Sequence, residues 1–173
     1  SEDGGRLEVA LVDLSGKGRT AGTRSLLCSG AIGGLLGQVE PERLLAAANH
    51  YLLRQEWPEG FASAVHLAID LRTGEFSLGN AGHPPPIQFA AGSGRWSVHE
   101  SAGGPVLGII PEAEFPRSQG VLGRGDALVL YTDGVIEARS HDLTRGLDRL
   151  LGKAESLVTA GFASGARRLC ADA

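Results

Sequence analysis

Apolar positions near the start of the chain follow the two-residue period of a strand. Leu7, Val9 and Leu11 lead to Asp13 in the segment LEVALVD, and most of the residues between them are also apolar. A strand that is apolar on both faces is typical of a buried position. We therefore predict a buried strand that ends on an aspartate and is followed by the glycine-rich turn SGKG at residues 15–18.

Two helices are predicted after this turn. Residues 20–37 are rich in Ala, Leu and Gly and contain no Pro, which favours a helix in which each glycine costs up to about 1 kcal/mol. The glycines indicate either close packing on a sheet or a helix that can reshape. A second helix begins at Pro41, an allowed first-turn position, and carries an apolar stripe with helical spacing. The stripe consists of Leu44, Leu45, Ala48, Tyr51, Leu52 and Gln55.

The rest of the chain shows strand periodicity and then a return to helix. The further predicted strands cover residues 61–71, 75–82, 85–90, 95–100 and 126–132. The first two are joined by the turn signal RTGE at residues 72–75, and the last ends at Asp133. Short helical segments are predicted after it. Helices segregated from hairpin-connected strands argue for an α+β fold with antiparallel sheets.

Composition narrows the class of protein. The chain has 173 residues, of which 42% are hydrophobic, and this suits one compact domain over residues 1–173. The net charge of −4 argues against a nucleic-acid partner, since such domains are usually basic. No apolar run approaches the roughly 18 residues of a membrane span, so we expect no membrane contact in this segment. The distant cysteines, Cys28 and Cys170, form no disulfide framework, which favours a cytoplasmic setting.

The turn after the first strand allows a nucleotide-binding interpretation. Gly16, Gly18 and Ala21 match the G-x-G-x-x-G/A pattern of dinucleotide-binding proteins. That fold needs a second strand soon after the helix, with an acid about 20 residues on, whereas here a second helix follows. Cysteine-phosphatase chemistry is also disfavoured, because Gly34 stands where the phosphate-binding arginine would be needed. Cys28 is predicted to be a small buried hydrophobe.

Asp13 and Asp133 suggest a metal site instead. Both stand where a hydrophobic strand runs into a Gly-containing turn. If the two strands are neighbours in one sheet, the carboxylates converge at one end of it. Carboxylates and backbone carbonyls are the ligands that Mg²⁺ and Mn²⁺ prefer. Because aspartate before glycine is also a common turn pair, either residue alone leaves the choice open.

Six separated motifs carry a resemblance to a known family. They are VDLSGKG (12–18), AGTRSLL (21–27), GFASAVHLAIDLRTG (60–74), NAGHPPP (80–86), GGPVLGIIP (103–111) and RGDALVLYTDGVIEAR (124–139). With these motifs in the family's order, the chain resembles the bacterial PPM-type phosphatases of the SpoIIE/RsbU class, relatives of the PP2C serine/threonine phosphatases. The resemblance implies a PP2C-like four-layer α-β-β-α sandwich with two antiparallel sheets and helices outside.

The resemblance also implies an activity and a site. Members hydrolyse phosphoserine or phosphothreonine with a water activated by two Mn²⁺ or Mg²⁺ ions. The family's pattern assigns metal binding to Asp13, to the carbonyl of Leu14 and to Asp133, and it implies no other cofactor. The implied partner is a phosphoprotein substrate such as a STAS-type anti-anti-sigma factor. A homodimer is kept open, and control through the two helices after Asp13 is suggested.

The roles of other polar residues are left open by the sequence. His83, in NAGHPPP, either carries a proton near the site or fixes its loop by hydrogen bonds. Lys17 either meets the substrate phosphate or stays solvated, and Glu137 is expected at the surface. The remaining histidines form no ligand spacing and are given core or surface roles; they are His50, His66, His99 and His141.

Two departures from the family pattern leave catalysis open. Complete members carry an acidic GGD-like motif upstream of the first strand, whereas Asp3-Gly4-Gly5 is predicted to be a hairpin turn. Members also end on a strand with paired aspartates, for which Asp172 is no substitute. We therefore expect a chain shortened at both ends. The alternative to an active enzyme is a catalytically inactive, PP2C-like regulatory binding domain.

Overall fold

The structure is a computed structural model that describes residues 2–3, 5–16, 18–55, 57, 60–100, 102–136, 143–159 and 161–171. Its elements in chain order are β1 (Glu2–Asp3), β2 (Arg6–Leu14), α1 (Gly18–Leu35), α2 (Pro41–Leu53), β3 (Ala62–Asp70), β4 (Glu75–Ala81), β5 (Ile87–Ala90), β6 (Arg95–Val98), β7 (Arg117–Val121), β8 (Ala127–Val129), the 3-10 turn η1 (Asp133–Val135), α3 (Leu143–Thr159) and α4 (Phe162–Ala171). They form two compact units. Unit 1 comprises Ser1–His83 and Glu100–Leu122, and unit 2 comprises Pro84–His99 and Gly123–Ala173.

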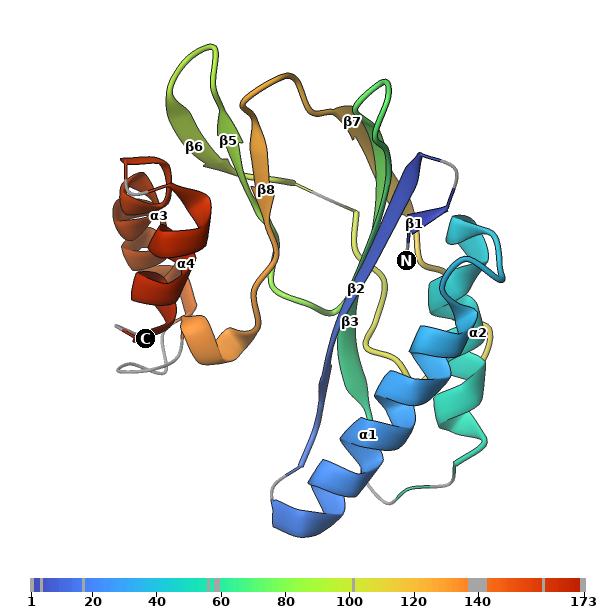
Figure 1. Cartoon of the computed structure of the whole chain (residues 1–173). Helices are drawn as coiled ribbons and strands as arrows, with labels where there is room; N and C mark the ends of the chain where they lie inside the picture. Colours follow the sequence, from blue (N-terminus) through green and yellow to red (C-terminus); the bar gives the residue numbers. More distant parts are fainter. Residues whose placement is uncertain are drawn as a thin grey trace. The chain divides into compact units, whose positions relative to one another are not determined.

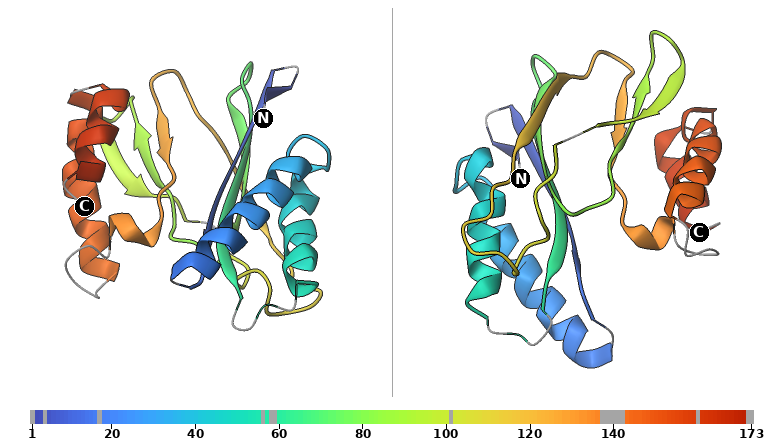
Figure 2. Two further views of the ribbon diagram at one scale, coloured as in Figure 1. Left: turned by 60° about the horizontal axis from the view of Figure 1, so that its bottom comes forward. Right: turned by 180° about the vertical axis from the view of Figure 1, so that it is seen from behind.

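Unit 1 is built on an antiparallel five-stranded sheet with the strand order β1-β2-β3-β4-β7. The long β2 and β3 pair along their whole lengths, from Arg6 opposite Asp70 to Leu14 opposite Ala62. Helices α1 and α2 lie side by side over one face of this sheet, as the views in Figures 1 and 2 agree. The hairpin predicted at Asp3-Gly4-Gly5 is confirmed, because Asp3 pairs with Arg6.

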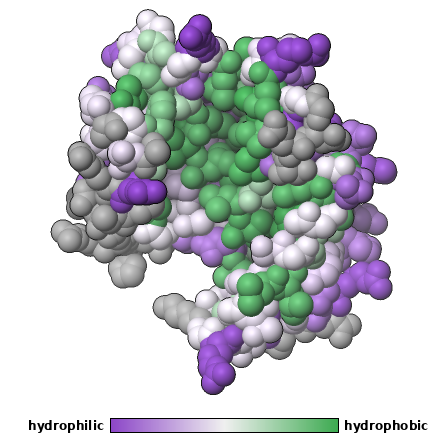
Figure 3. Space-filling view, viewed as in Figure 1, coloured by the Kyte–Doolittle hydropathy of each residue, from purple (hydrophilic) through white to green (hydrophobic). Residues whose placement is uncertain are grey.

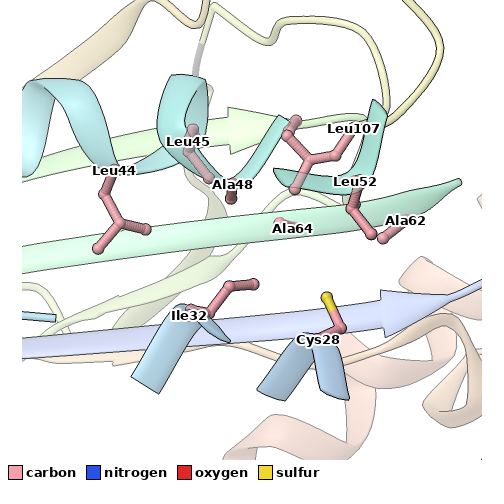
Figure 4. Packing of buried hydrophobic residues seen from close by; sticks show 10 residues of the cluster. Cys28, Ile32, Leu44, Leu45, Ala48, Leu52, Ala62, Ala64 and Leu107 are labelled. Atoms are coloured by element: carbon pink, nitrogen blue, oxygen red, sulfur yellow. The ribbon is translucent and has the colours of Figure 1, made fainter. Parts of the chain in front are cut away.

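Alternation along the strands decides which side chains meet the helices. Ala10, Val12 and Leu14 of β2 face the same way as Ala62 and Ala64 of β3, because register partners share a face. Ala10, Val12 and Leu14 pack against a buried cluster to which both helices and β3 contribute, and Figure 4 shows members of this cluster from α1, α2 and β3. The cluster consists of Cys28, Ile32, Leu44, Leu45, Ala48, Leu52, Ala62, Ala64, Ala81 and Leu107. Asp13, one position out of phase, projects from the opposite face.

A polar network is buried beneath the start of α2. His66 of β3 has no exposed side-chain surface; its Nε2 lies 3.3 Å from the Oε2 of Glu8, itself paired with Arg6 at 3.0 Å. Arg117 lies 3.2 Å from the other ring nitrogen through Nη1, which also donates to the carbonyl of Pro41 at 2.9 Å. The network therefore ties the first residue of α2 to the sheet.

Unit 2 has its own sheet and its own core. The three strands are antiparallel in the order β6-β5-β8, and α3 packs against α4 and β6. The cluster consists of Ile87, Tyr131, Ile136, Leu150, Ala154 and Leu157. Asp126, directly before β8, is bonded to the residue that follows β5: its carboxylate accepts a hydrogen bond from the backbone N–H of Ala91 at 2.8 Å. The same carboxylate accepts a second bond from the N–H of Gly123 at 2.9 Å.

The predicted α+β class with two antiparallel sheets is confirmed, with three differences in the elements. Strand β7 was not predicted, because its sequence RSQGV is polar and its neighbours are loops. Strand β8 covers only Ala127–Val129 of the predicted 126–132, and α3 runs for 17 residues where short helices were expected. None of the helices in the described part of the chain combines the length and apolar character needed to span a bilayer.

Candidate metal centre

Asp13 lies at the end of β2 that leads into the glycine-rich turn. It is half-buried and stands opposite Ser63 of β3. The next residue but one, Ser15, ties this end down: its N–H donates to the carbonyl of Phe61 at 2.8 Å, and its Oγ accepts from the N–H of Phe61 at 3.1 Å. Gly16 then takes a φ of 124°, which favours glycine. The carboxylate thus sits on a fixed strand immediately before a sharp turn.

The carbonyl of Leu14 lies outside the hydrogen-bond ladder between β2 and β3. Its register partner Ala62 exchanges its backbone bonds with Leu107 instead, at 3.0 Å as donor and 2.8 Å as acceptor. Leu14 therefore belongs to a pair that is not hydrogen-bonded, and its carbonyl points away from β3. Within the part of the chain that the structure describes, β1 pairs only with Arg6 and Leu7 of β2, so β1 does not reach this oxygen.

Asp133 lies in unit 2, where it is exposed and begins η1. The segment before it is anchored by Tyr131, whose hydroxyl donates to the carbonyl of Pro85 at 2.8 Å. Burial raises the pKa of Tyr131 to about 12, so the hydroxyl stays a donor across the physiological range. The carbonyl of Asp133 accepts from the N–H of Ile136 at 2.8 Å, which closes the turn.

The two aspartates were predicted to converge if their strands are neighbours in one sheet, and this condition is not met. Strand β2 pairs with β1 and β3, whereas β8 pairs only with β5 in the part of the chain that the structure describes. The convergence of Asp13 and Asp133 therefore stays a prediction.

His83 is held in unit 1 by two neighbours. The side-chain amide of Asn80 accepts from the N–H of His83 at 2.8 Å and donates to its carbonyl at 2.9 Å. The ring Nδ1 lies 2.8 Å from Oγ of Ser63. Two roles were predicted for His83. The hydrogen bonds that fix the loop are made by the side chain of Asn80 and the backbone of His83, while the ring of His83 bonds to Ser63, the residue of β3 that stands opposite Asp13.

The donors fit a hard divalent cation in kind but fall short in number. Asp13, Leu14 and Asp133 offer only oxygen atoms, as Mg²⁺ and Mn²⁺ require. Among the residues that the structure describes, no group of three or more His, Cys, Asp or Glu side chains is placed to hold a metal ion. Four residues weighed in the sequence lie outside the described residues; they are Lys17, Glu137, His141 and Asp172. Cys28 is 2% exposed, as predicted for a buried hydrophobe.

Two polar residues that lie next to the candidate metal ligands, Ser63 and Tyr131, were not singled out in the sequence. Ser63 was hidden within the strand pattern FASAVHLAIDL, and the register that brings it opposite Asp13 is not visible before β2 and β3 are paired. Tyr131 was treated only as an apolar strand residue. Its position two residues before Asp133 was the available signal, because a buried tyrosine hydroxyl usually needs a partner.

Comparison with known proteins relates the whole chain to one family. Residues 3–172 match the model of the family described as Stage II sporulation protein E (SpoIIE). The phosphoserine phosphatase RsbU of Bacillus subtilis is 25% identical over 137 residues, which cover 79% of this chain and 41% of RsbU. The chain thus spans less than half the length of this relative.

Solved structures share the fold. The RsbU and RsbW domains of Rv1364c from Mycobacterium tuberculosis match with a TM-score of 0.82 and 28% identity, covering 98% of this chain and 46% of that one. The SiaA-PP2C domain of Pseudomonas aeruginosa matches with a TM-score of 0.80 and 17% identity, covering 99% and 70%. RsbX in complex with magnesium matches with a TM-score of 0.62 and 17% identity, covering 87% and 75%.

Proposed function

The chain belongs to the SpoIIE family, and on this premise we propose that it is a metal-dependent protein serine/threonine phosphatase. The observation that carries the proposal is the family match over residues 3–172, since it spans both strand-end aspartates. The similarity to RsbU, a phosphoserine phosphatase, supports the same activity. We extend the proposal to a single phosphatase domain formed by both units.

In this proposal Asp13, the carbonyl of Leu14 and Asp133 hold two Mg²⁺ or Mn²⁺ ions. Such ions lower the pKa of a bound water and neutralise the phosphoryl oxygens of a substrate. The chain's own contribution is to fix the oxygens: the Ser15–Phe61 bonds hold the end of β2, and Tyr131 holds the approach to Asp133. The carbonyl of Leu14 supports the assignment, because it belongs to a pair that makes no hydrogen bond in the ladder between β2 and β3.

The substrate in this proposal is a phosphoserine or phosphothreonine on a regulatory protein. By resemblance it is a STAS-type anti-anti-sigma factor. A homodimer and a cytoplasmic location remain predictions. The rival function is a catalytically inactive regulatory binding domain, and the shortage of acidic donors among the described residues favours it.

Hydrolysis of p-nitrophenyl phosphate and of a phosphoserine peptide tests the proposal. We expect turnover that requires Mn²⁺ or Mg²⁺ and disappears with EDTA. Asp13→Asn and Asp133→Asn should each lower kcat/KM by about 100-fold or more, equivalent to about 2.7 kcal/mol of transition-state stabilisation. Asp148→Asn, which removes an exposed carboxylate from α3, is the matched control and should change nothing.

The outcomes separate the rivals. Folded protein that hydrolyses neither substrate with either ion favours the inactive regulatory domain. Activity that survives in Asp13→Asn would rule out the proposed metal centre. Binding of ATP or NAD without any response to Mn²⁺ would restore the nucleotide-binding interpretation of Gly16, Gly18 and Ala21.

A further inference from the structure

Three large apolar side chains are exposed close together in unit 1. Phe61 is 38% exposed, Ile109 54% and Ile110 48%. A Cβ added at Gly108 would lie 3.7 Å from the Cα of Phe61, so the segment that leads into Ile109 passes directly against Phe61. We name these three residues the apolar patch. Exposed apolar side chains that gather at one place mark interaction sites, whereas single scattered ones are ordinary.

The apolar patch adjoins the strand end that carries Asp13. The carbonyl of Phe61 accepts a hydrogen bond from the N–H of Ser15 at 2.8 Å, and the N–H of Phe61 donates to the Oγ of Ser15 at 3.1 Å. Ser15 stands two residues after Asp13, which is about 7 Å along an extended chain. A protein bound with a phosphorylated side chain at Asp13 would therefore bring its neighbouring residues over Phe61.

The loop that presents the two isoleucines is held by a buried polar side chain. Asn49 of α2 is only 3% exposed. Its Oδ1 accepts from the N–H of Gly108 at 2.8 Å, and its Nδ2 donates to the carbonyl of Ile110 at 2.9 Å. The loop is the yellow trace that runs beside α2 in Figure 1. Because the loop is fixed before any partner arrives, binding to it costs little conformational entropy.

Acidic side chains follow the apolar patch along the same loop. Glu112 and Glu114 are exposed, and residues 103–116 contain no Lys or Arg. Charge complementarity therefore favours a partner with Lys or Arg beyond its apolar residues. A symmetric dimer through the patch would bring the same acidic loop of both copies together, so a second copy of this chain fits the surface less well.

We propose that the apolar patch docks the phosphoprotein substrate, through apolar side chains next to its phosphoserine or phosphothreonine and through Lys or Arg farther out. This proposal rests on the proposed phosphatase function and adds to it a preference for the sequence around the phosphorylated residue. Such a patch binds ground and transition state alike, so it changes KM and not kcat. p-Nitrophenyl phosphate has no chain to place on the isoleucines and is the reference substrate.

Two synthetic phosphoserine peptides of equal length test the docking. In the first, leucines flank the phosphoserine and lysines stand at both ends; in the second, serines replace the leucines. We expect the wild-type KM to be about tenfold lower for the leucine peptide, with similar kcat. In the double variant Ile109→Ser/Ile110→Ser this preference should vanish, while turnover of p-nitrophenyl phosphate is unchanged. Equal wild-type KM values for the two peptides would overturn the proposal.

Two further variants test the position and the charge of the docking surface. Leu71→Ser removes another exposed side chain, 50% exposed, at the opposite end of β3, and should leave the peptide preference intact. Glu112→Lys/Glu114→Lys should raise the KM of the leucine peptide about threefold at low salt and less at high salt. A loss of preference in Leu71→Ser as large as in the isoleucine variant would overturn the proposal.

Binding can also be followed without turnover and without a variant. A phosphonate analogue of the leucine peptide, added to the Mg²⁺-loaded protein, should shift the methyl NMR signals of Ile109 and Ile110. The signals of Ile87, buried in the core of unit 2, should stay in place. If the double isoleucine variant does not fold, this measurement still decides, because unchanged Ile109 and Ile110 signals at saturating peptide contradict the docking.

Failure of the two proposals can be told apart. Protein that hydrolyses p-nitrophenyl phosphate without preferring the leucine peptide keeps the phosphatase function and loses the docking surface. Protein that hydrolyses nothing with Mn²⁺ or Mg²⁺ overturns the phosphatase function, and the patch as a substrate site with it. A wild-type dimer that Ile109→Ser/Ile110→Ser dissociates, with the peptide KM unchanged, would assign the patch to a second copy of the chain and overturn the docking.

Discussion

The two helices that cover the unit 1 sheet are held to very different degrees. Helix α2, with 13 residues, buries Pro41, Leu44, Leu45, Ala48, Asn49 and Leu52, whereas α1, with 18 residues, buries only Cys28 and Ile32. In Figure 4 these last two side chains point from α1 toward the sheet. The spacing of apolar residues, and not the length of a helix, thus sets how firmly it docks.

Glycine explains much of the weakness of α1. Apart from the backbone of α1 itself, a Cβ added at Gly22, Gly30, Gly33 or Gly34 would meet no atom of the described residues within 4 Å, so the close-packing interpretation of these glycines is wrong. A pocket of about 310 Å³ lies between α1 and β2, lined in part by Cys28 and Ile32. Leu26 is 77% exposed, and apolar surface shows over this helix at the bottom of Figure 3. Helix α1 can therefore move at less cost than α2.

Truncating one leucine in each helix gives the largest expected contrast. Leu44→Ala should lower the free energy of unfolding by about 2–5 kcal/mol, because Leu44 has no exposed surface and its loss leaves a cavity. Leu26→Ala in α1 should change it by no more than about 0.5 kcal/mol. Urea denaturation of both variants measures the difference. Equal losses would show that α1 and α2 contribute alike.

Acid should loosen α2 before α1. His66, whose pKa is lowered to about 4 from 6.5 by burial and by Arg117, is neutral in the folded protein, whereas the unfolded chain takes up a proton below 6.5. Its contribution to stability is therefore complete above pH 6.5 and is lost as the pH falls toward 4, by on the order of 3 kcal/mol. Urea midpoints between pH 7 and 4.5 measure this loss.

Two controls tie the acid effect to the anchor of α2. In His66→Gln the part of the pH dependence that belongs to this residue should vanish. Hydrogen exchange should rise in α2 and not in α1 as the pH falls, because Arg117 bonds both to His66 and to Pro41 at the start of α2. The groups around the ring that also carry charge are Arg6, Glu8 and Glu42. A uniform rise in exchange over both helices would speak against this anchor.

Filling a glycine in α1 should give the smallest effect and the opposite sign. Gly30→Ala should stabilise the protein by about 0.5–1 kcal/mol, because alanine favours the helix and meets no neighbour. Ala48→Gly in α2, at a site only 1% exposed, should destabilise it by at least as much. Thermal unfolding of the pair is the measurement. A loss of stability in Gly30→Ala would mean that α1 is already closely packed.

Much of the fold could be predicted from the sequence because local patterns decide it. The alternation in β2 and β3 and the stripe of α2 each reflect one buried face, and the observed bounds differ from the predicted ones by a few residues. Strand β7 could not be predicted in this way. It forms because Arg117 bonds to Ser77 and its backbone pairs with β4, and such partners become visible only when distant segments meet.

The candidate site also combines residues that a local pattern reveals with residues that only distant contacts reveal. Asp13 and Asp133 stand out in the sequence because each stands where an apolar run leads into a Gly-containing turn. Ser63 and the anchoring role of Tyr131 depend on register and on a contact with Pro85, which no local pattern encodes. His83 could be singled out from its motif, but the partner of its ring could not.

The alternation of side chains between the two faces of β2 also restricts which mutations this strand can accept during evolution. Glu8 and Leu14 belong to the helix-covered side of the sheet, and Asp13 to the other side. Insertion or deletion of a single residue between positions 8 and 13 would exchange the two sides for everything on one side of the change. The carboxylate of Asp13 would turn toward the buried cluster under the helices, and Leu14 would turn to the opposite face of the sheet. This strand can therefore accept substitutions more readily than a change in its number of residues.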